Sequence, residues 1–181
     1  MTDEEYQAMV ARIQTGAVLV GVDRAMARKF YTDVPLSRIA EETGEAPYFE
    51  KVVVLGAFVG GPLSLLASFI MAVLAFGWWA AVTIPASIIV YALFASASSM
   101  PRQGMASVSA VLGFALLGLY LGWFPSNYVG WFTVLVVFAL WNARLVYSVA
   151  TTFIRAFVVR NRRAFEFLMP HIQLREANTL V

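Results

Sequence analysis

The sequence predicts an all-α, polytopic membrane protein: a bundle of four transmembrane helices with cytoplasmic amphipathic helices at both ends. From Val52 to Trp141 the chain has one charged side chain, Arg102, in ninety residues. The composition is 60% hydrophobic and 13% charged, whereas soluble proteins are about 45–50% apolar and about 25% charged. The remaining charges lie before and after the apolar block, which indicates that the block faces lipid rather than water.

Residues 1–51 are predicted to form a cytoplasmic or interfacial helical segment. Thr2 followed by Glu5 is the pattern of a capping box, which marks a helix start. The helix that follows carries apolar residues on one side: Tyr6, Met9, Val10, Ile13, Ala17 and Val20. A second, short helix is expected over 35–43, with a stop at Gly44. These helices are expected either to lie on the inner membrane face or to dock a cytoplasmic partner.

The short helix carries one resemblance to a known motif. Leu36–Gly44 looks like the first helix and turn of a helix-turn-helix, with the Ile39-Ala40 pair and the glycine at the usual offset. The second helix of such a motif would cover 47–55, which runs directly into the apolar block. Glu45 and Glu50 stand where phosphate-binding Lys or Arg would be needed. The sequence therefore predicts no binding of nucleic acid.

The apolar block, together with its continuation to residue 150, accommodates four spans of about 20 residues each. The predicted spans cover residues 52–77, 78–98, 105–124 and 128–150. Glycine, proline and small polar residues mark the connections between them. Because Pro62 and Pro85 both disfavour a continuous helix, the run from 52 to 98 could instead be one span with a re-entrant element.

Four spans place both termini on the same side of the membrane, and the charges indicate which side. Residues 1–51 hold six Lys/Arg and nine Asp/Glu, a net charge of −3, and residues 142–181 hold six Arg and two Glu, a net charge of +4. With the Arg102 loop, these segments contain all thirteen Lys and Arg, so they are expected in the cytoplasm. Tryptophans cluster near the two uncharged turns, as is typical of the membrane–water interface on the outer side: Trp78, Trp79, Trp123 and Trp131. The expected location is a bacterial inner (cytoplasmic) membrane.

Residues 151–181 are predicted to extend the last span as a basic cytoplasmic helix that stays in phase until Pro170, followed by a tail. One face of this helix is apolar and the other is basic. Its arginines are expected to contact lipid phosphates of the inner leaflet or a partner protein: Arg155, Arg160, Arg162 and Arg163.

Two polar residues of the last span are candidates for intramembrane contacts. Arg144 lies about 14 residues past the start of the span, roughly 20 Å along the helix at 1.5 Å per residue. It could snorkel to lipid phosphate. No Asp or Glu occurs between Lys51 and Arg163, so an acidic partner would be Glu50, another cytoplasmic acid, or an acid on another subunit. Asn142 needs a hydrogen-bond partner and is expected to face protein.

Small residues recur at every fourth position of the first span: Gly56, Gly60, Ser64, Ser68 and Ala72. The third span repeats the pattern briefly, with Gly118 and Gly122. Small residues allow two helix backbones to approach closely. The stripe therefore predicts either tight packing inside the bundle or an interface with another subunit.

The sequence contains no evident constellation of catalytic residues. The chain has no Cys and a single His, His171, which excludes disulfides and a His-based metal site within one chain. The predicted spans contain no carboxylate for a proton relay and no base to activate a serine. No enzyme activity, cofactor or metal is expected.

By elimination, the sequence predicts a non-catalytic integral subunit that scaffolds, anchors or stabilises a larger membrane complex. Its expected partners are the lipid bilayer and other membrane-protein subunits, in a hetero-complex or a homo-oligomer. The alternative is a homo-oligomeric channel or small-solute permeation protein, with a pore lined by polar side chains: Ser64, Ser68, Thr83 and Ser87.

Overall fold

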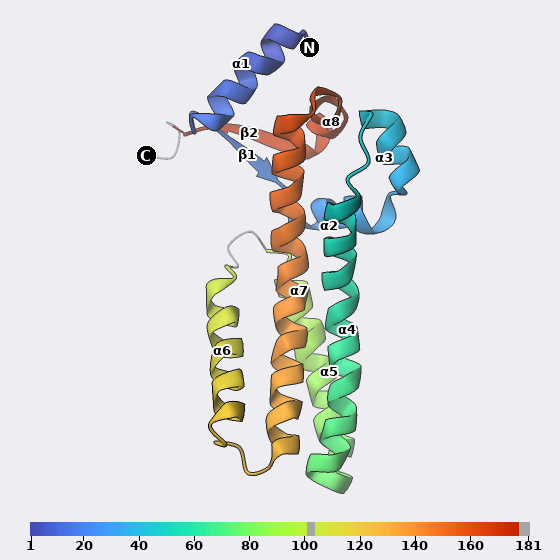
Figure 1. The fold of residues 1–181 in the computed structure, drawn as a ribbon, viewed down its shortest axis with the longest axis vertical. Coiled ribbons are helices and arrows are strands. Elements are labelled where there is room, and N and C mark those ends of the chain that lie inside the picture. The colour runs from blue at the N-terminus through green and yellow to red at the C-terminus, as the bar shows by residue number, and fades with distance from the viewer. Residues whose placement is uncertain (101–103, 178–181) are drawn as a thin grey trace. The chain divides into compact units, whose positions relative to one another are not determined.

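The computed structural model describes residues 1–100 and 104–177, and Figure 1 shows its helices and strands. The chain divides into two compact units. Unit 1 combines Met1–Val54 with the C-terminal part of the chain from Val149, and unit 2 comprises Leu55–Ser148. Arg102, the one charge predicted between the second and third spans, lies outside the described residues.

Unit 1 is assembled from both ends of the chain. Its N-terminal part contains α1 (Asp3–Gln14), β1 (Val18–Val22), α2 (Arg24–Asp33) and α3 (Leu36–Thr43). Its C-terminal part contains α8 (Arg162–Leu168), the 3-10 helix η2 (Met169–His171) and β2 (Ile172–Glu176). The first turns of α4 (Tyr48–Phe76) and the last turns of α7 (Asn127–Arg160) complete it. The sequence predicted the two flanking segments separately and did not predict that they fold together.

The two strands pair antiparallel, from Val18 opposite Glu176 to Val22 opposite Ile172. They are a correction to the sequence analysis, which placed Ala17 and Val20 on the apolar face of the first helix. That helix ends at Gln14, and Gly16 follows with a φ of 76°. A left-handed glycine reverses the chain, and the β-branched valines beyond it favour an extended strand.

The predicted helix starts in the N-terminal segment are confirmed. The backbone N–H of Glu5 donates to the Thr2 hydroxyl at 3.2 Å, and the backbone N–H of Thr2 donates to the Glu5 carboxylate at 2.7 Å, which completes the capping box. Helix α3 ends against Gly44, whose φ of 75° gives the expected stop. Helix α2 was not predicted. Asp23 caps it by accepting a hydrogen bond from the backbone N–H of Met26 at 2.7 Å.

The apolar faces of these helices are buried inside unit 1 rather than left open. Their core side chains are Tyr6, Val10, Phe30, Tyr31 and Ile39. The C-terminal part supplies the opposing side chains: Ile154, Phe157, Val158, Phe165 and Leu168. The apolar faces of α1 and α3 were expected to rest on the membrane or on a partner, and in the structure they form part of the core of a folded domain.

The predicted continuous helix from the last span to Pro170 is corrected at Asn161. Helix α7 ends at Arg160, and Asn161 adopts an extended conformation with φ −135° and ψ 113°. The Asn161 side chain accepts a hydrogen bond from the backbone N–H of Ala164 at 2.9 Å and so starts α8. Asparagine is a strong N-cap residue, and this preference outweighs the continuing helical pattern.

All the regular secondary structure described in unit 2 is helical. The unit contains most of α4 and α7, together with η1 (Gly77–Trp79), α5 (Ala80–Ala97) and α6 (Ala106–Tyr120). Within this unit α4 and α5 form one hairpin, and α6 and α7 form a second (Figure 1). Pro62 lies inside α4 and Pro85 inside α5, and neither ends its helix.

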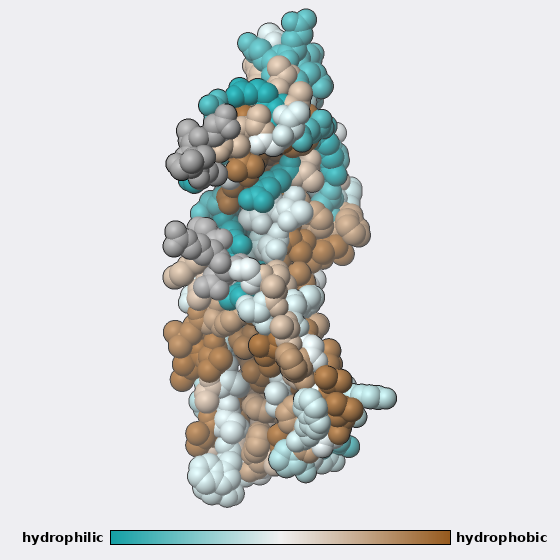
Figure 2. Space-filling model, turned by 90° about the vertical axis from the view of Figure 1, so that its left-hand side faces the viewer, coloured by the Kyte–Doolittle hydropathy of each residue, from teal (hydrophilic) through white to brown (hydrophobic). Residues whose placement is uncertain are grey.

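Two helical stretches of the described residues are long and apolar enough to cross a membrane: Tyr48–Ala97, with 50 residues, and Asn127–Arg160, with 34 residues. The third predicted span, 105–124, appears as the 15-residue helix α6, which is shorter than the about 20 residues that a span usually needs. Large hydrophobic side chains are exposed on all four helices of unit 2, for example Leu66, Ile89, Phe114 and Phe138. Figure 2 shows such hydrophobic side chains on the surface of the molecule.

Candidate functional site

Arg144 lies on α7 in unit 2 and is buried, with 5% of its surface exposed. Its Nη1 atom donates a hydrogen bond to the carbonyl oxygen of Gly104 at 2.9 Å and lies 3.5 Å from the hydroxyl oxygen of Ser107. The guanidinium carbon lies 4.5 Å from the centroid of the Phe94 ring, a cation–π contact. Arg144 thus connects the end of α5 with the start of α6, a contact that the sequence did not predict.

Asn142 is also buried on α7 and, as expected, faces protein. Its Nδ2 atom donates to the carbonyl oxygen of Phe138 at 3.0 Å. Its Oδ1 atom lies against Gly60 of α4, where an added Cβ would come within 3.3 Å of it. At the neighbouring Gly61, a Cβ would come within 2.7 Å of the Tyr91 hydroxyl of α5. These two glycines therefore let polar side chains from two other helices approach α4.

The small-residue stripe of the first span packs largely inside unit 2. Ser68 and Ala72 are fully buried, and Gly60 faces Asn142 as described. Ser64 donates its hydroxyl to the carbonyl oxygen of Gly60 at 2.7 Å. Gly56 alone of the stripe is open, with nothing near the position of an added Cβ. Most of the stripe is therefore occupied by contacts within one chain.

Gly118 and Gly122 do not share a helix face, which corrects the second small-residue pattern. Gly118 lies in α6 against the rings of Trp123 and Phe124, whereas Gly122 lies beyond the helix with a φ of 69°. The backbone N–H of Trp123 donates to the carbonyl oxygen of Gly118 at 2.9 Å, and that of Gly122 donates to Leu119 at 3.3 Å. This is a Schellman motif, so Gly122 serves to end the helix.

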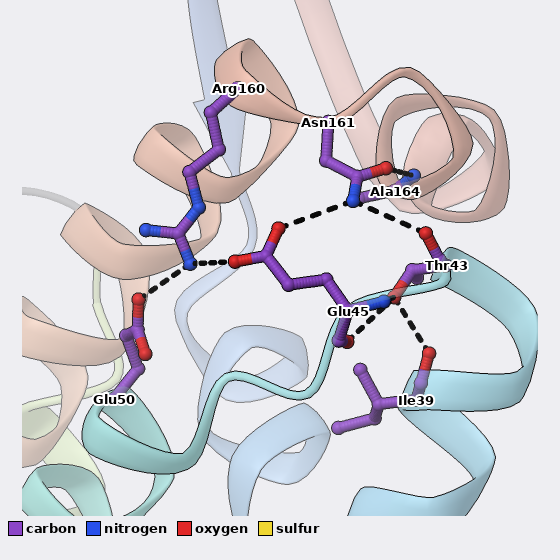
Figure 3. A network of polar contacts seen from close by, with 7 residues as sticks. All are labelled: Ile39, Thr43, Glu45, Glu50, Arg160, Asn161 and Ala164. Carbon is purple, nitrogen blue, oxygen red and sulfur yellow. Dashed lines mark hydrogen bonds and ion pairs between the residues drawn. The ribbon is translucent and has the colours of Figure 1, made fainter.

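Arg160 is the centre of a polar network in unit 1 (Figure 3). Its Nη2 atom lies 2.8 Å from the Glu50 carboxylate of α4 and 2.8 Å from the Glu45 carboxylate of the α3–α4 connection. Burial opposes the charged form of Arg160, but the hydrogen bond to Glu50 and the charges of Glu45 and Glu50 prevail and raise its pKa. One cation therefore holds two carboxylates that precede the uncharged block beginning at Val52.

Asn161 extends this network to α3 (Figure 3). Its Nδ2 atom donates to the carbonyl oxygen of Thr43 at 3.2 Å and to the Glu45 carboxylate at 3.2 Å. The Thr43 hydroxyl, which is buried, donates to the carbonyl oxygen of Ile39 at 2.7 Å. The same asparagine thus caps α8 and ties it to the end of α3.

The other arginines predicted to meet lipid phosphate fall into two groups. Arg162 forms ion pairs with Asp3 of α1 and Glu166 of α8, and it is therefore engaged inside unit 1 as Arg160 is. Arg155 is exposed, and neither Arg155 nor Arg163 has an ion pair among the described residues. Of the four candidates, these two keep their charge available for an outside anion.

The serines proposed to line a pore use their hydroxyls on their own helices. Ser68 donates to the carbonyl oxygen of Leu65 at 2.6 Å, and Ser87 donates to that of Ile84 at 2.8 Å. Both serines are buried. Hydroxyls engaged in this way offer less to a permeating solute than free ones would.

Several residues that join the two ends of the chain were not singled out from the sequence. The Tyr6 hydroxyl donates to the carbonyl oxygens of Val158 and Val159, at 3.1 and 2.7 Å. In the sequence, Glu45 counted only against nucleic-acid binding, and Glu50 was named as a possible partner of Arg144, whereas both pair with Arg160 in the structure. The available signal was the opposite net charge of the two flanking segments, because acids before the apolar block and arginines after it can pair.

No group of three or more His, Asp or Glu among the described residues is placed to hold a metal ion. Comparison with protein-family models, with curated proteins and with solved structures finds no match to this chain.

Proposed function

We propose that this chain is a non-catalytic integral membrane subunit with four spans, which carries a folded cytoplasmic domain made from both of its ends. The domain is unit 1. Its role would be to scaffold, anchor or stabilise a larger complex in an inner, cytoplasmic membrane.

The observation that carries the proposal is the joining of the two ends of the chain in unit 1. Strand β1 pairs with β2, and the hydroxyl of Tyr6 bonds to the end of α7. Two segments can fold together in this way only on the same side of a membrane. The number of crossings between them is therefore even.

The lengths of the helices support four crossings rather than two. The stretch Tyr48–Ala97 has 50 residues, or about 75 Å of helix at 1.5 Å per residue, against a hydrocarbon core of about 30 Å. It reverses at η1, where Gly77 has a φ of 55°. One hairpin thus accounts for two spans, and α6 with α7 accounts for two more. Apolar residues flanking α6 and local thinning of the bilayer can make up its short length.

The role as a subunit rests on the chemistry that the spans contain. The spans contain no carboxylate, and the buried polar side chains of unit 2, such as Arg144 and Asn142, bond to backbone carbonyls within the chain. Unit 1 is a folded domain with a core of its own, which is a suitable element for contact with other proteins.

Purification in a mild detergent tests this role. Other chains that co-purify at a fixed stoichiometry would support a subunit. A pure homo-oligomer that conducts ions or small solutes in liposomes would overturn it in favour of a channel. The matched control is the same preparation with Arg162→Met and Arg160→Met, which weakens unit 1 and should release partners while the spans stay in the membrane.

A further inference from the structure

The first turn of α4, in unit 1, separates its polar from its apolar side chains. Glu50 is engaged by Arg160, and the Lys51 ammonium donates to the backbone carbonyl of Val34. Tyr48, Phe49 and Val52 instead point outward, with 65%, 70% and 66% of their surfaces exposed. These three residues are called the interfacial patch.

The interfacial patch is backed by a row of aromatic rings. The ring of Phe49 lies 6.3 Å from that of Phe153 on α7, and Phe153 lies 6.3 Å from Tyr31. Tyr31 in turn meets Phe30 edge to face at 5.1 Å. The patch is therefore fixed to the core of unit 1 rather than carried on a loose segment.

The other large apolar side chains exposed in the described part of unit 1 are Met1, Leu19 and Met169, which stand singly. The patch has three such residues within five positions. A domain surrounded by water gains nothing from exposing them together, and such groups mark a contact with lipid or protein.

We propose that Tyr48, Phe49 and Val52 insert into the headgroup–acyl boundary of the inner leaflet, so that the membrane interface begins at Tyr48. This rests on the proposed membrane location. Lipid is the expected occupant because α4 runs without interruption from Tyr48 to Phe76, and this first turn opens the apolar stretch Tyr48–Ala97. Aromatic residues are enriched at that depth. The charges of Glu50 and Lys51 do not oppose insertion, because both already have partners in unit 1.

Site-directed spin labelling tests the proposal directly. The chain has no Cys, so a single introduced cysteine carries the only label. The variants Phe49→Cys and Val52→Cys are reconstituted as the full chain in vesicles of phosphatidylethanolamine and phosphatidylglycerol. Collisions of the label with oxygen, which concentrates in lipid, are compared with collisions with a water-soluble nickel chelate. Val52→Cys removes no ring contact, so it reads the patch even if Phe49→Cys disturbs the packing on Phe153.

Labels at both patch positions are expected to collide more with oxygen than with the nickel chelate. Leu19→Cys and Met169→Cys are the matched controls, because these residues are also exposed in unit 1, at 45% and 51%. They are expected to favour the nickel chelate. If the patch labels behave like these controls, the proposal fails. It also fails if they are shielded from both reagents, because a protein partner or a second copy then covers the patch.

A further pair of labels separates this proposal from the membrane assignment itself. Leu66→Cys and Ile70→Cys lie on the exposed side of α4 in unit 2. If these labels collide more with oxygen while the patch labels collide more with the nickel chelate, the proposed spans are supported and only the insertion of the interfacial patch is wrong. If the labels at Leu66 and Ile70 collide more with the nickel chelate than with oxygen, the proposed membrane location, and with it the proposed function, fails.

Discussion

At the scale of single residues, two tyrosines in unit 1 differ in how their hydroxyls are used. The Tyr6 hydroxyl donates to two backbone carbonyls at the end of α7. The Tyr31 hydroxyl is buried and has no hydrogen-bond partner among the described residues. Burial raises the pKa of the Tyr31 phenol well above its ordinary range, and the charges of Glu50 and Glu45 raise it further.

This difference predicts opposite effects for the same substitution. Tyr6→Phe should lower the free energy of unfolding by about 1 kcal/mol, because a hydrogen bond is lost. Tyr31→Phe should leave it unchanged or raise it, because an unsatisfied buried hydroxyl is removed. The midpoint of thermal unfolding in detergent measures both. Equal losses for the two variants would contradict the assigned hydroxyl contacts.

The raised pKa of Tyr31 also predicts a dependence on pH. Above about pH 10 the phenol ionises in the unfolded chain but stays protonated in the folded one. The unfolded state then binds fewer protons, so stability falls as the pH rises. Between pH 9 and about 11 this loss should be smaller in Tyr31→Phe than in the wild type. An identical loss in both proteins would show that Tyr31 does not cause it.

Arg160 is the residue on which the polar network of unit 1 depends. Arg160→Met should destabilise unit 1 by about 1–2 kcal/mol, because it leaves the largely buried Glu50 without its partner. The estimate is modest because Arg160 and Glu45 are partly exposed to solvent. Arg155→Met is the control, since Arg155 is exposed and has no ion pair among the described residues. Similar unfolding midpoints for the two variants would mean that the network contributes nothing.

At the scale of elements, the sequence predicted the apolar helices more closely than the structure of unit 1. The ranges expected as spans at 52–77 and 128–150 fall almost entirely on α4 and α7, because long apolar runs need no distant partner to be recognised. The strands β1 and β2 were missed because each has five residues and finds its partner 150 to 158 positions away. Val20 of β1 was placed on a helix face, since nothing local indicates the pairing.

The candidate contacts show the same division between local and distant information. The spacing of small residues predicted a close-contact stripe, but only the fold identifies Asn142 as the neighbour of Gly60. Because the predicted spans contain no Asp or Glu, the sequence indicated no partner for Arg144 within them. Its hydrogen bond to the backbone carbonyl of Gly104 could not be predicted, because every residue has a backbone carbonyl and the sequence does not show which one accepts a bond.

The packing of α4 against α5 predicts that alanine substitutions at two glycines of α4 differ strongly in their effect on stability. Gly61→Ala should destabilise unit 2 by about 1–3 kcal/mol, because its Cβ would overlap the hydroxyl of Tyr91. Gly56→Ala, in open space on the same helix, should cost nothing. Adding Tyr91→Phe should recover part of the loss at Gly61. Equal thermal midpoints for the two single variants would contradict this packing.

The start of α6 depends on Arg144. Arg144→Leu removes the bond to the Gly104 carbonyl and the contact with the Phe94 ring, so it should weaken folding and assembly more than Arg144→Lys. Lysine keeps a charge and a donor. The yield of folded protein after detergent extraction measures the difference. Wild-type yields from both variants would show that Arg144 does not hold α6.

At the scale of the whole molecule, two segments far apart in the sequence fold into one domain. Val20 and Leu174 are directly opposed in the β1–β2 register. The pair Val20→Cys and Leu174→Cys should therefore form a disulfide, and a chain cut between α5 and α6 should stay linked without reductant. The pair Val20→Cys and Glu176→Cys is two residues out of register and should link far less. Equal linking by both pairs would contradict the register.

In the proposed topology, the chain crosses a membrane an even number of times, with unit 1 in the cytoplasm and the turns at Gly77–Trp79 and 121–126 outside. Side-specific labelling of intact spheroplasts with a membrane-impermeant maleimide tests it most directly. Single cysteines at Trp79 and Ser126 should react from outside, whereas those at Leu19 and Met169 should react only after permeabilisation. Labelling of Leu19 and Met169 from opposite sides, or of all four positions from the same side, would contradict the account.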